Sequence, residues 1–133
     1  MSASALVLVV EDEALILMDL EVALQDAGFT VLTAPDAKTA MSLYGERSGE
    51  IRAVLTDIRL GNGPSGWDVA RHAREMAPAM PVVYVSGDSA GEWASQGVPN
   101  SIMIAKPYAF AQVVTALSTL MNAPDQLLAS SPS

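Results

Sequence analysis

The sequence predicts an α/β fold in which five parallel strands form one doubly wound sheet with helices on both faces. Five short apolar runs alternate with five segments of helical periodicity, and the connections between them are short. The apolar runs do not alternate between apolar and polar residues, as is expected when helices cover both faces of a sheet. Because β-α-β crossovers are right-handed, this order builds a parallel (βα)5 sheet.

The first two β-α units show these patterns most clearly. The apolar run 5–10 predicts a strand, and 13–27 follows with an apolar stripe at helical spacing. Gly28 stands where the end of a helix favours glycine. A second strand is expected at 29–33 and a shorter helix at 36–46. The apolar positions of that helix repeat at helical spacing: Ala37, Ala40, Met41 and Tyr44.

The remaining three units repeat the same order. Apolar runs predict strands at 53–56, 82–85 and 102–105. Helical periodicity predicts helices at 67–77, 89–96 and 109–122, and the first of these ends before Pro78, which cannot continue a helix. We therefore expect one domain over residues 1–123. The segment 124–133 is expected to be a flexible C-terminal tail.

Composition narrows the class of protein. The chain has 133 residues, a formal net charge of −8 and no cysteine, which excludes disulfides and thiolate metal sites. The negative charge argues against nucleic acid and makes a multivalent cation a more natural partner. No apolar run approaches the ~20 residues that span a bilayer, and no signal peptide is evident. We expect a cytoplasmic protein that is not bound to a membrane.

Charged and hydroxyl side chains follow four of the five expected strands. They are Glu11 and Asp12, Asp57, Ser86, and Lys106. The carboxyl ends of parallel strands meet at one edge of the sheet, where ligands of such folds bind. Carboxylates gathered there would repel one another without a cation, and hard oxygen ligands favour Mg²⁺, with Mn²⁺ as a substitute. An ammonium and a hydroxyl suit a phosphoryl group, so Asp57 is interpreted as its nucleophilic acceptor.

Five short motifs in this order resemble the response-regulator receiver family of two-component signalling. They are "VVEDE" with Glu11 and Asp12, "LTDIRL" with Asp57, "GW" at 66–67, "VSG" with Ser86, and "AKPY" with Lys106. The resemblance covers residues 5 to 122 and implies a CheY-like, flavodoxin-like fold. It also implies a stand-alone signalling domain rather than an enzyme, with self-phosphorylation from small phosphodonors and autodephosphorylation.

The resemblance also implies a role for each site residue. Asp57 would accept a phosphoryl group from a phosphohistidine of a sensor kinase or phosphotransfer protein. Asp12, Asp57 and the backbone carbonyl of Arg59 would bind Mg²⁺ directly, and Glu11 would act largely through water. Ser86 and Lys106 would contact the phosphoryl oxygens. Phosphorylation would then control binding to a downstream protein, which the sequence does not identify.

Two positions depart from the family pattern. Met103 replaces the Tyr or Phe that usually stands three residues before the lysine, and Gly61 replaces the usual proline four residues after the phosphorylated aspartate. We therefore expect a more mobile loop beside the site and a switch without aromatic rotation. The sequence "YVSGD" at 84–88, together with the missing aromatic, is similar to the alphaproteobacterial FATGUY-like branch of stand-alone receivers.

Two other functions compete with this interpretation. A Mg²⁺-dependent aspartyl-phosphate phosphatase of the haloacid-dehalogenase type would need a second Asp two residues after the nucleophile, where this chain has Arg59. A degenerate pseudo-receiver that only binds partners would not need the intact set of five site residues.

The helix at 13–27 has a second apolar stripe, opposite the stripe that faces the core. It consists of Leu15, Met18 and Val22. An exposed apolar stripe on an acidic protein indicates an interface, and we expect a kinase or phosphotransfer helix to dock there. The alternative is that Leu127 and Leu128 of the tail cover it.

Overall fold

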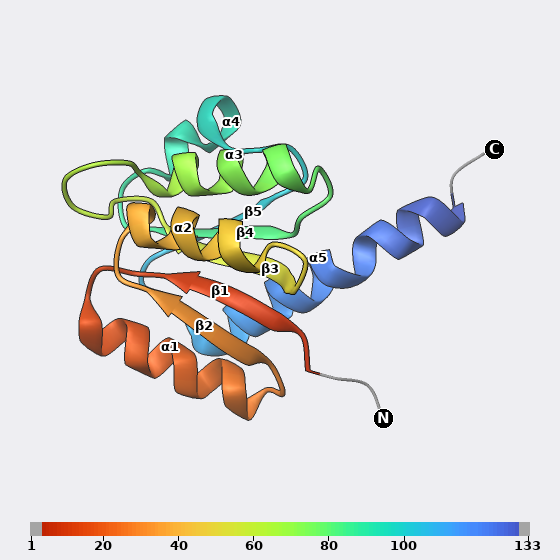
Figure 1. The fold of residues 1–133 in the computed structure, drawn as a ribbon, viewed down its shortest axis with the longest axis horizontal. Helices are drawn as coiled ribbons and strands as arrows, with labels where there is room; N and C mark the ends of the chain where they lie inside the picture. Colours follow the sequence, from red (N-terminus) through yellow and green to blue (C-terminus); the bar gives the residue numbers. More distant parts are fainter. Residues whose placement is uncertain (1–3, 131–133) are drawn as a thin grey trace.

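One five-stranded parallel sheet, with strand order β2-β1-β3-β4-β5, forms the centre of the molecule (Figure 1). The computed structural model describes residues 4–130, and their side chains through residue 122. The strands are β1 (Leu6–Val10), β2 (Thr30–Ala34), β3 (Ile51–Asp57), β4 (Val82–Ser86) and β5 (Ile102–Ala105). The helices are α1 (Ala14–Asp26), α2 (Ala37–Arg47), α3 (Gly66–Met76), α4 (Trp93–Gln96) and α5 (Phe110–Ser130). The expected doubly wound α/β fold is confirmed.

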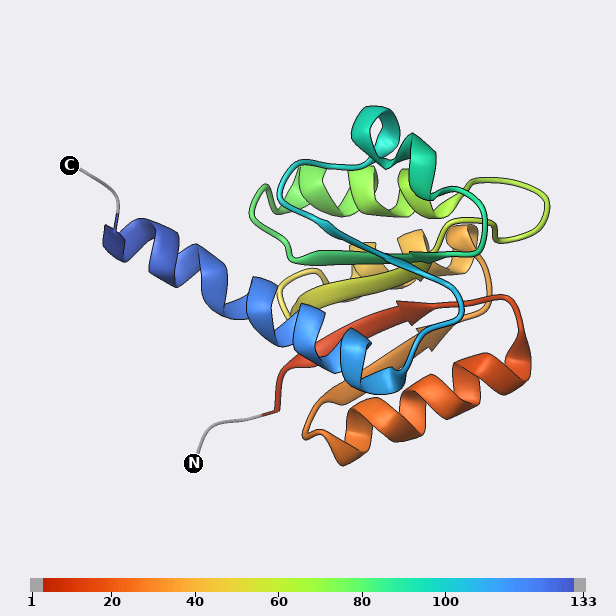
Figure 2. The same ribbon diagram turned by 180° about the vertical axis from the view of Figure 1, so that it is seen from behind.

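Helices cover both faces of the sheet and create two apolar cores. Helices α2 and α3 pack on one face (Figure 1), and α1 and α5 pack on the other (Figure 2). Along β1, Leu6, Leu8 and Val10 belong to the α2/α3 core, whereas Val7 and Val9 belong to the α1/α5 core. Every residue of β1 is therefore buried, which explains why the strand sequences are apolar throughout.

Local sequence signals fix several helix ends. The Asp36 carboxylate accepts a hydrogen bond from the Thr39 amide at 2.7 Å and so caps the start of α2. Ser65 and Asp68 form a capping box at the start of α3. Gly28 follows α1 with φ +99°, a conformation that glycine adopts without a steric penalty.

The structure differs from the sequence prediction at three elements. Strand β3 is longer than expected and includes Asp57 as its last residue. The weak helix expected at 89–96 is a 3₁₀ turn, Ala90–Glu92, followed by the single turn of α4. Helix α5 continues past the expected end at 122, through most of the segment 124–133, and its last turns project beyond the sheet (Figure 1). That this segment is a flexible tail stays a prediction. No helix within the described residues is both long and apolar enough to cross a membrane.

Candidate functional site

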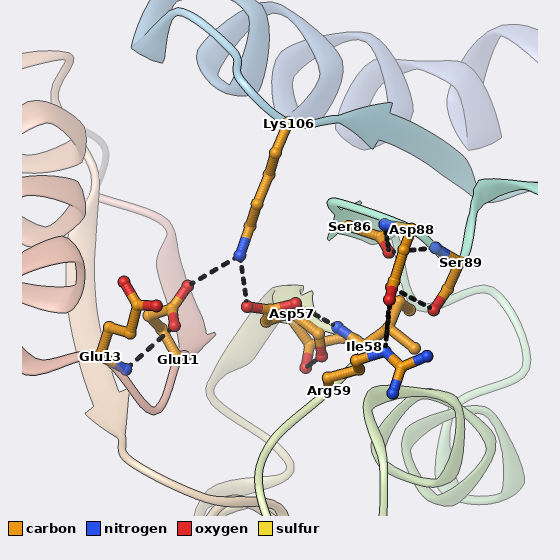
Figure 3. A network of polar contacts seen from close by, with 10 residues as sticks. Glu11, Glu13, Asp57, Ile58, Arg59, Ser86, Asp88, Ser89 and Lys106 are labelled. Atoms are coloured by element: carbon orange, nitrogen blue, oxygen red, sulfur yellow. Dashed lines mark hydrogen bonds and ion pairs between the residues drawn. The ribbon is translucent and has the colours of Figure 1, made fainter.

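The predicted site residues meet at the carboxyl edge of the sheet. Glu11 follows β1, Asp57 ends β3, Ser86 ends β4 and Lys106 follows β5. Because β3 lies between β1 and β4, Glu11 and Ser86 lie on opposite sides of Asp57, and Lys106 reaches across from β5 (Figure 3). This juxtaposition follows from the parallel order of the strands.

Asp57 is the centre of this cluster. Its side chain is buried, and one carboxylate oxygen accepts a hydrogen bond from the Ile58 amide at 2.7 Å. The other oxygen accepts from the Lys106 ammonium, also at 2.7 Å. A buried carboxylate needs such partners because the protein interior solvates charge poorly. Asp57 is thus held in a fixed orientation at the rim of the sheet.

The backbone of α3 begins directly against Asp57. The Gly66 amide donates to the Ile58 carbonyl at 2.8 Å. A methyl group added at Gly66 would overlap the Asp57 carbonyl oxygen and approach the Ile58 Cα to 3.0 Å. The "GW" motif therefore has a steric reason, since only glycine allows α3 to start so close to Asp57.

Lys106 links the two buried acids. Its ammonium lies 2.7 Å from Asp57 and 3.9 Å from the Glu11 Oε1 atom (Figure 3). Burial by itself lowers the pKa of Lys106, but the hydrogen bond to Asp57 and the charges of Asp57 and Glu11 outweigh it, so the pKa is raised. Lys106 therefore stays charged and offsets part of the negative charge of the cluster.

Glu11 is the most buried acid of the site, with 1% of its surface exposed. Its Oε2 atom accepts a hydrogen bond from the Glu13 amide at 3.0 Å. Its Oε1 atom has no hydrogen-bond partner among residues 4–122. Burial, with a further contribution from the charge of Asp57, raises the pKa of Glu11 to about 7. Glu11 is therefore a group that a bound cation would strongly stabilise in its charged form.

Three carboxylates form a cluster that could hold a metal ion. One oxygen each from Glu11, Asp12 and Asp57 lie within 4.8 Å of one another. Asp12 is exposed, so the cluster opens to solvent on one side. An all-oxygen, acidic ligand set fits a hard divalent cation, and the partnerless Glu11 oxygen supplies an available ligand atom. The backbone carbonyl of Arg59 stays a predicted further ligand.

Ser86 is buried beside the cluster with its hydroxyl hydrogen available. The Ser86 Oγ accepts hydrogen bonds from the amides of Asp88 and Ser89, at 3.2 and 2.7 Å. Both contacts use the oxygen as acceptor, which leaves the O–H free to donate to a ligand at the site.

A contact that the sequence did not predict joins the two loops beside Ser86. The Arg59 guanidinium lies 2.9 Å from the Asp88 carboxylate, and both side chains are exposed. The hydrogen bonds from Arg59 and Ser89 lower the pKa of Asp88. Asp88 had no site signal in the sequence, because "SGDS" is typical of an ordinary turn.

The structure shows the local environment of Gly61 and Met103, the two positions that depart from the family pattern. Gly61 adopts φ +79°, and a Cβ atom added to it would lie 4.0 Å from an Asp12 oxygen. Where the family usually has proline, this chain therefore has a left-handed turn beside the acidic cluster. Met103 lies on β5, opposite Tyr84 in the register, and packs against the α2/α3 core. Tyr84 itself is fully buried, and its hydroxyl accepts from the Val98 amide at 3.1 Å.

Fold and site together define a doubly wound α/β domain whose sheet edge carries a lysine and an acidic cluster that could hold a metal ion. Residues 7–118 match the response regulator receiver domain family, and the chain belongs to this family. Receiver domains are signalling domains of two-component systems rather than classical enzymes, and the family interacts with histidine kinases or phosphotransfer proteins.

A solved structure and two curated proteins illustrate the similarity. A response regulator receiver protein from Sinorhizobium medicae is 47% identical, with a TM-score of 0.87, over 90% of this chain and 96% of that chain. The sensor kinase CckA of Brucella abortus is 29% identical over 94% of this chain. The phyllosphere-induced regulator PhyR of Methylorubrum extorquens is 28% identical over 84% of this chain.

The chain spans 13% of the length of CckA and 42% of the length of PhyR. The similarity to these two proteins therefore concerns one domain of each. The narrower resemblance to the FATGUY-like branch and the expected stand-alone organisation stay predictions.

Proposed function

We propose that this chain is a phosphoryl acceptor of two-component signalling, with Asp57 as the acceptor. The observation that carries the proposal is the convergence of three carboxylates with the Lys106 ammonium, 2.7 Å from Asp57, at the carboxyl edge of the sheet. A nucleophilic carboxylate held between a cation site and a lysine is arranged for phosphoryl transfer.

In the proposed reaction a carboxylate oxygen of Asp57 attacks the phosphorus of a phosphohistidine. A P–O bond to Asp57 forms as the P–N bond breaks, and the electron pair of that bond stays on the histidine nitrogen. Lys106 turns from the carboxylate to the phosphoryl oxygens, and the free O–H of Ser86 donates to another of these oxygens. Water then attacks the phosphorus of the acyl phosphate, the P–O bond to Asp57 breaks, and inorganic phosphate leaves, which returns Asp57 to its carboxylate form.

The proposed cofactor is Mg²⁺, for which Mn²⁺ can substitute. Asp12, Asp57 and the carbonyl of Arg59 would hold it directly, and Glu11 would contribute largely through water. When bound, the ion offsets the negative charge that the carboxylates and the phosphoryl oxygens share. The 4.8 Å cluster and the partnerless Glu11 oxygen support this assignment.

Phosphorylation is proposed to act by changing how the domain binds a downstream protein. The phosphodonor would be a histidine kinase or phosphotransfer protein, and small donors such as acetyl phosphate would serve in its place. Because histidine kinases take their phosphoryl group from ATP, we propose a cytoplasmic location. Hydrolytic turnover as a phosphatase is less well supported, because Arg59 pairs with Asp88 where that chemistry needs an acid.

The direct test is labelling with acetyl phosphate and Mg²⁺, read by intact mass. Wild type should gain one phosphoryl group, chelation of Mg²⁺ should abolish the gain, and Asp57→Ala should not be labelled. Asp26→Ala, which removes a carboxylate at the far end of α1, is the matched control and should be labelled like wild type. Labelling of Asp57→Ala would refute the assignment of the acceptor.

A further inference from the structure

Tyr108 places a buried hydroxyl beside the site without a visible structural purpose. The Oη atom has no hydrogen-bond partner in the part of the chain with described side chains. A buried hydroxyl without a partner costs stability, so such a group calls for an explanation in function. The ring is well anchored, since it packs against the α1/α5 core and meets Phe110 edge-on at 6.3 Å.

Tyr108 lies on the same face of the sheet as the side chains of the site. Val9, Leu55 and Ile104 all belong to the α1/α5 core, and Glu11, Asp57 and Lys106 each stand two residues further along. The amides of Glu11 and Lys106 still donate to the neighbouring strands, so the alternation continues to these residues. Tyr108 packs against that same core.

The charges of the site act on the Tyr108 hydroxyl. Burial and the nearby charge of Glu11 raise the pKa of Tyr108 to about 12, while Lys106 opposes this and Asp57 adds to it. The hydroxyl therefore stays protonated and can only donate to a carboxylate. Glu11 Oε1 lies near Lys106, also lacks a hydrogen-bond partner among residues 4–122, and is an acceptor.

Among the described side chains, only the Lys106 ammonium forms an ion pair with Glu11 Oε1, at a distance of 3.9 Å (Figure 3). The same ammonium donates a hydrogen bond to Asp57. In the proposed function Lys106 moves to the phosphoryl oxygens. Glu11 would then lose the nearby positive charge of Lys106. A bound cation would offset the charge of Glu11, but the buried Oε1 atom would still lack a hydrogen-bond donor among residues 4–122, which is costly.

We propose that Tyr108 is a positioning residue of the phosphorylated state: its hydroxyl donates to Glu11, directly or through one water, once Lys106 has turned to the phosphoryl group. In the resting state the hydroxyl has no partner among residues 4–122, so it is available in the phosphorylated state. This inference rests on the proposed function of Asp57.

The test separates cation binding from binding of a phosphoryl substitute. Calorimetry would measure the affinity for Mg²⁺ alone and then for beryllofluoride in saturating Mg²⁺, in wild type and Tyr108→Phe. We expect Tyr108→Phe to weaken beryllofluoride binding about tenfold, the effect of one hydrogen bond to a charged group. Its affinity for Mg²⁺ alone should be unchanged, and the metal-free protein should melt no lower than wild type.

Tyr44→Phe is the matched control, since it deletes another buried hydroxyl, which donates to the Ala73 carbonyl at 3.4 Å between α2 and α3. It should lower the melting temperature and leave both affinities unchanged. The inference is overturned if Tyr108→Phe binds beryllofluoride like wild type, if both affinities fall equally, or if its metal-free form melts lower. Failure of wild type itself to bind beryllofluoride would instead refute the proposed function.

Discussion

At the scale of single residues, Glu11 is a buried acid whose charged form is destabilised by its surroundings. Its carboxylate is almost completely buried, yet only one of its oxygens is hydrogen-bonded within the described part of the chain. Nearby Asp57 adds repulsion, and Lys106 relieves only part of it. In the metal-free protein burial and the charge of Asp57 therefore raise the pKa of Glu11, and a bound cation would favour its charged form.

The raised pKa of Glu11 predicts how the stability of the metal-free protein depends on pH. The pKa of Glu11 rises from 4.5 in the unfolded chain to about 7 in the folded protein, so its contribution to stability is complete below pH 4.5 and lost as pH rises through 7. In EDTA, wild type should lose on the order of 2 kcal/mol more than Glu11→Gln between about pH 5 and pH 8. Urea denaturation at the two pH values measures this, and equal losses in both proteins would contradict it.

A substitution at Gly66 tests the close packing of the start of α3 against Asp57. Gly66→Ala pushes a methyl group into the Asp57 carbonyl, a contact that only movement of β3 or α3 can relieve. We expect a loss of roughly 2 kcal/mol or more in unfolding free energy, together with slower acetyl-phosphate labelling.

Gly45→Ala is the matched control for Gly66→Ala, because Gly45 lies within α2 and an added methyl group there meets nothing within 4 Å. It should be neutral or stabilising by up to ~1 kcal/mol, since alanine favours a helix. If the two alanine variants behave alike, the close approach of α3 to Asp57 is not important.

At the scale of elements, α1 presents an apolar stripe to solvent. Leu15, Met18 and Val22 are 76%, 59% and 56% exposed, whereas Leu20 and Leu24 on the same helix are buried. The predicted exposure of the stripe is confirmed as far as residues 4–122 are concerned. The alternative prediction, that Leu127 and Leu128 cover the stripe, concerns residues whose side chains are not described. No basic residue occurs in α1, so a basic partner helix would suit this surface.

We predict that this stripe is where the phosphodonor docks. Leu15→Ser with Val22→Ser should slow phosphotransfer from a cognate kinase or phosphotransfer protein about tenfold or more, because burying these two apolar side chains on docking would stabilise the complex. Labelling by acetyl phosphate should not change, since it needs no docking.

Met76→Ser is a control for the docking prediction, because Met76 is an exposed apolar residue of α3 on the other face of the sheet. It should affect neither route. If the α1 double variant slows both routes equally, the site or the fold has been damaged. If it slows neither, docking occurs elsewhere.

At the scale of the whole molecule, the sheet edge makes stability depend on the cation. Lys106 offsets only part of the repulsion among Glu11, Asp12 and Asp57, and a cation that binds the folded state would relieve more of it, so Mg²⁺ should stabilise the protein by mass action. At ten times its dissociation constant the gain is about 1.4 kcal/mol, which raises the melting temperature by a few degrees. Thermal melts over a Mg²⁺ titration measure this, and a melting temperature indifferent to millimolar Mg²⁺ would contradict it.

Prediction from the sequence succeeded where a pattern is local. The apolar strands and the amphipathic helices follow from side-chain periodicity, and the parallel order then brings Asp57 and Lys106 together. It was less accurate at the ends of elements with weak patterns. The segment 89–96 has too few core-facing residues for a full helix, and its only α-helical turn is Trp93–Gln96.

The sequence alone thus determined the fold class, the residues that meet at the sheet edge and the exposed stripe of α1, because each follows from residue type and spacing along the chain. Only the tertiary structure decided how deeply Glu11 is buried, that Arg59 pairs with Asp88, and that the hydroxyl of Tyr108 has no partner within the described residues. These properties arise from the distances between residues that are far apart in the chain. Burial and neighbouring charge set the pKa of Glu11, and neither can be read from local periodicity.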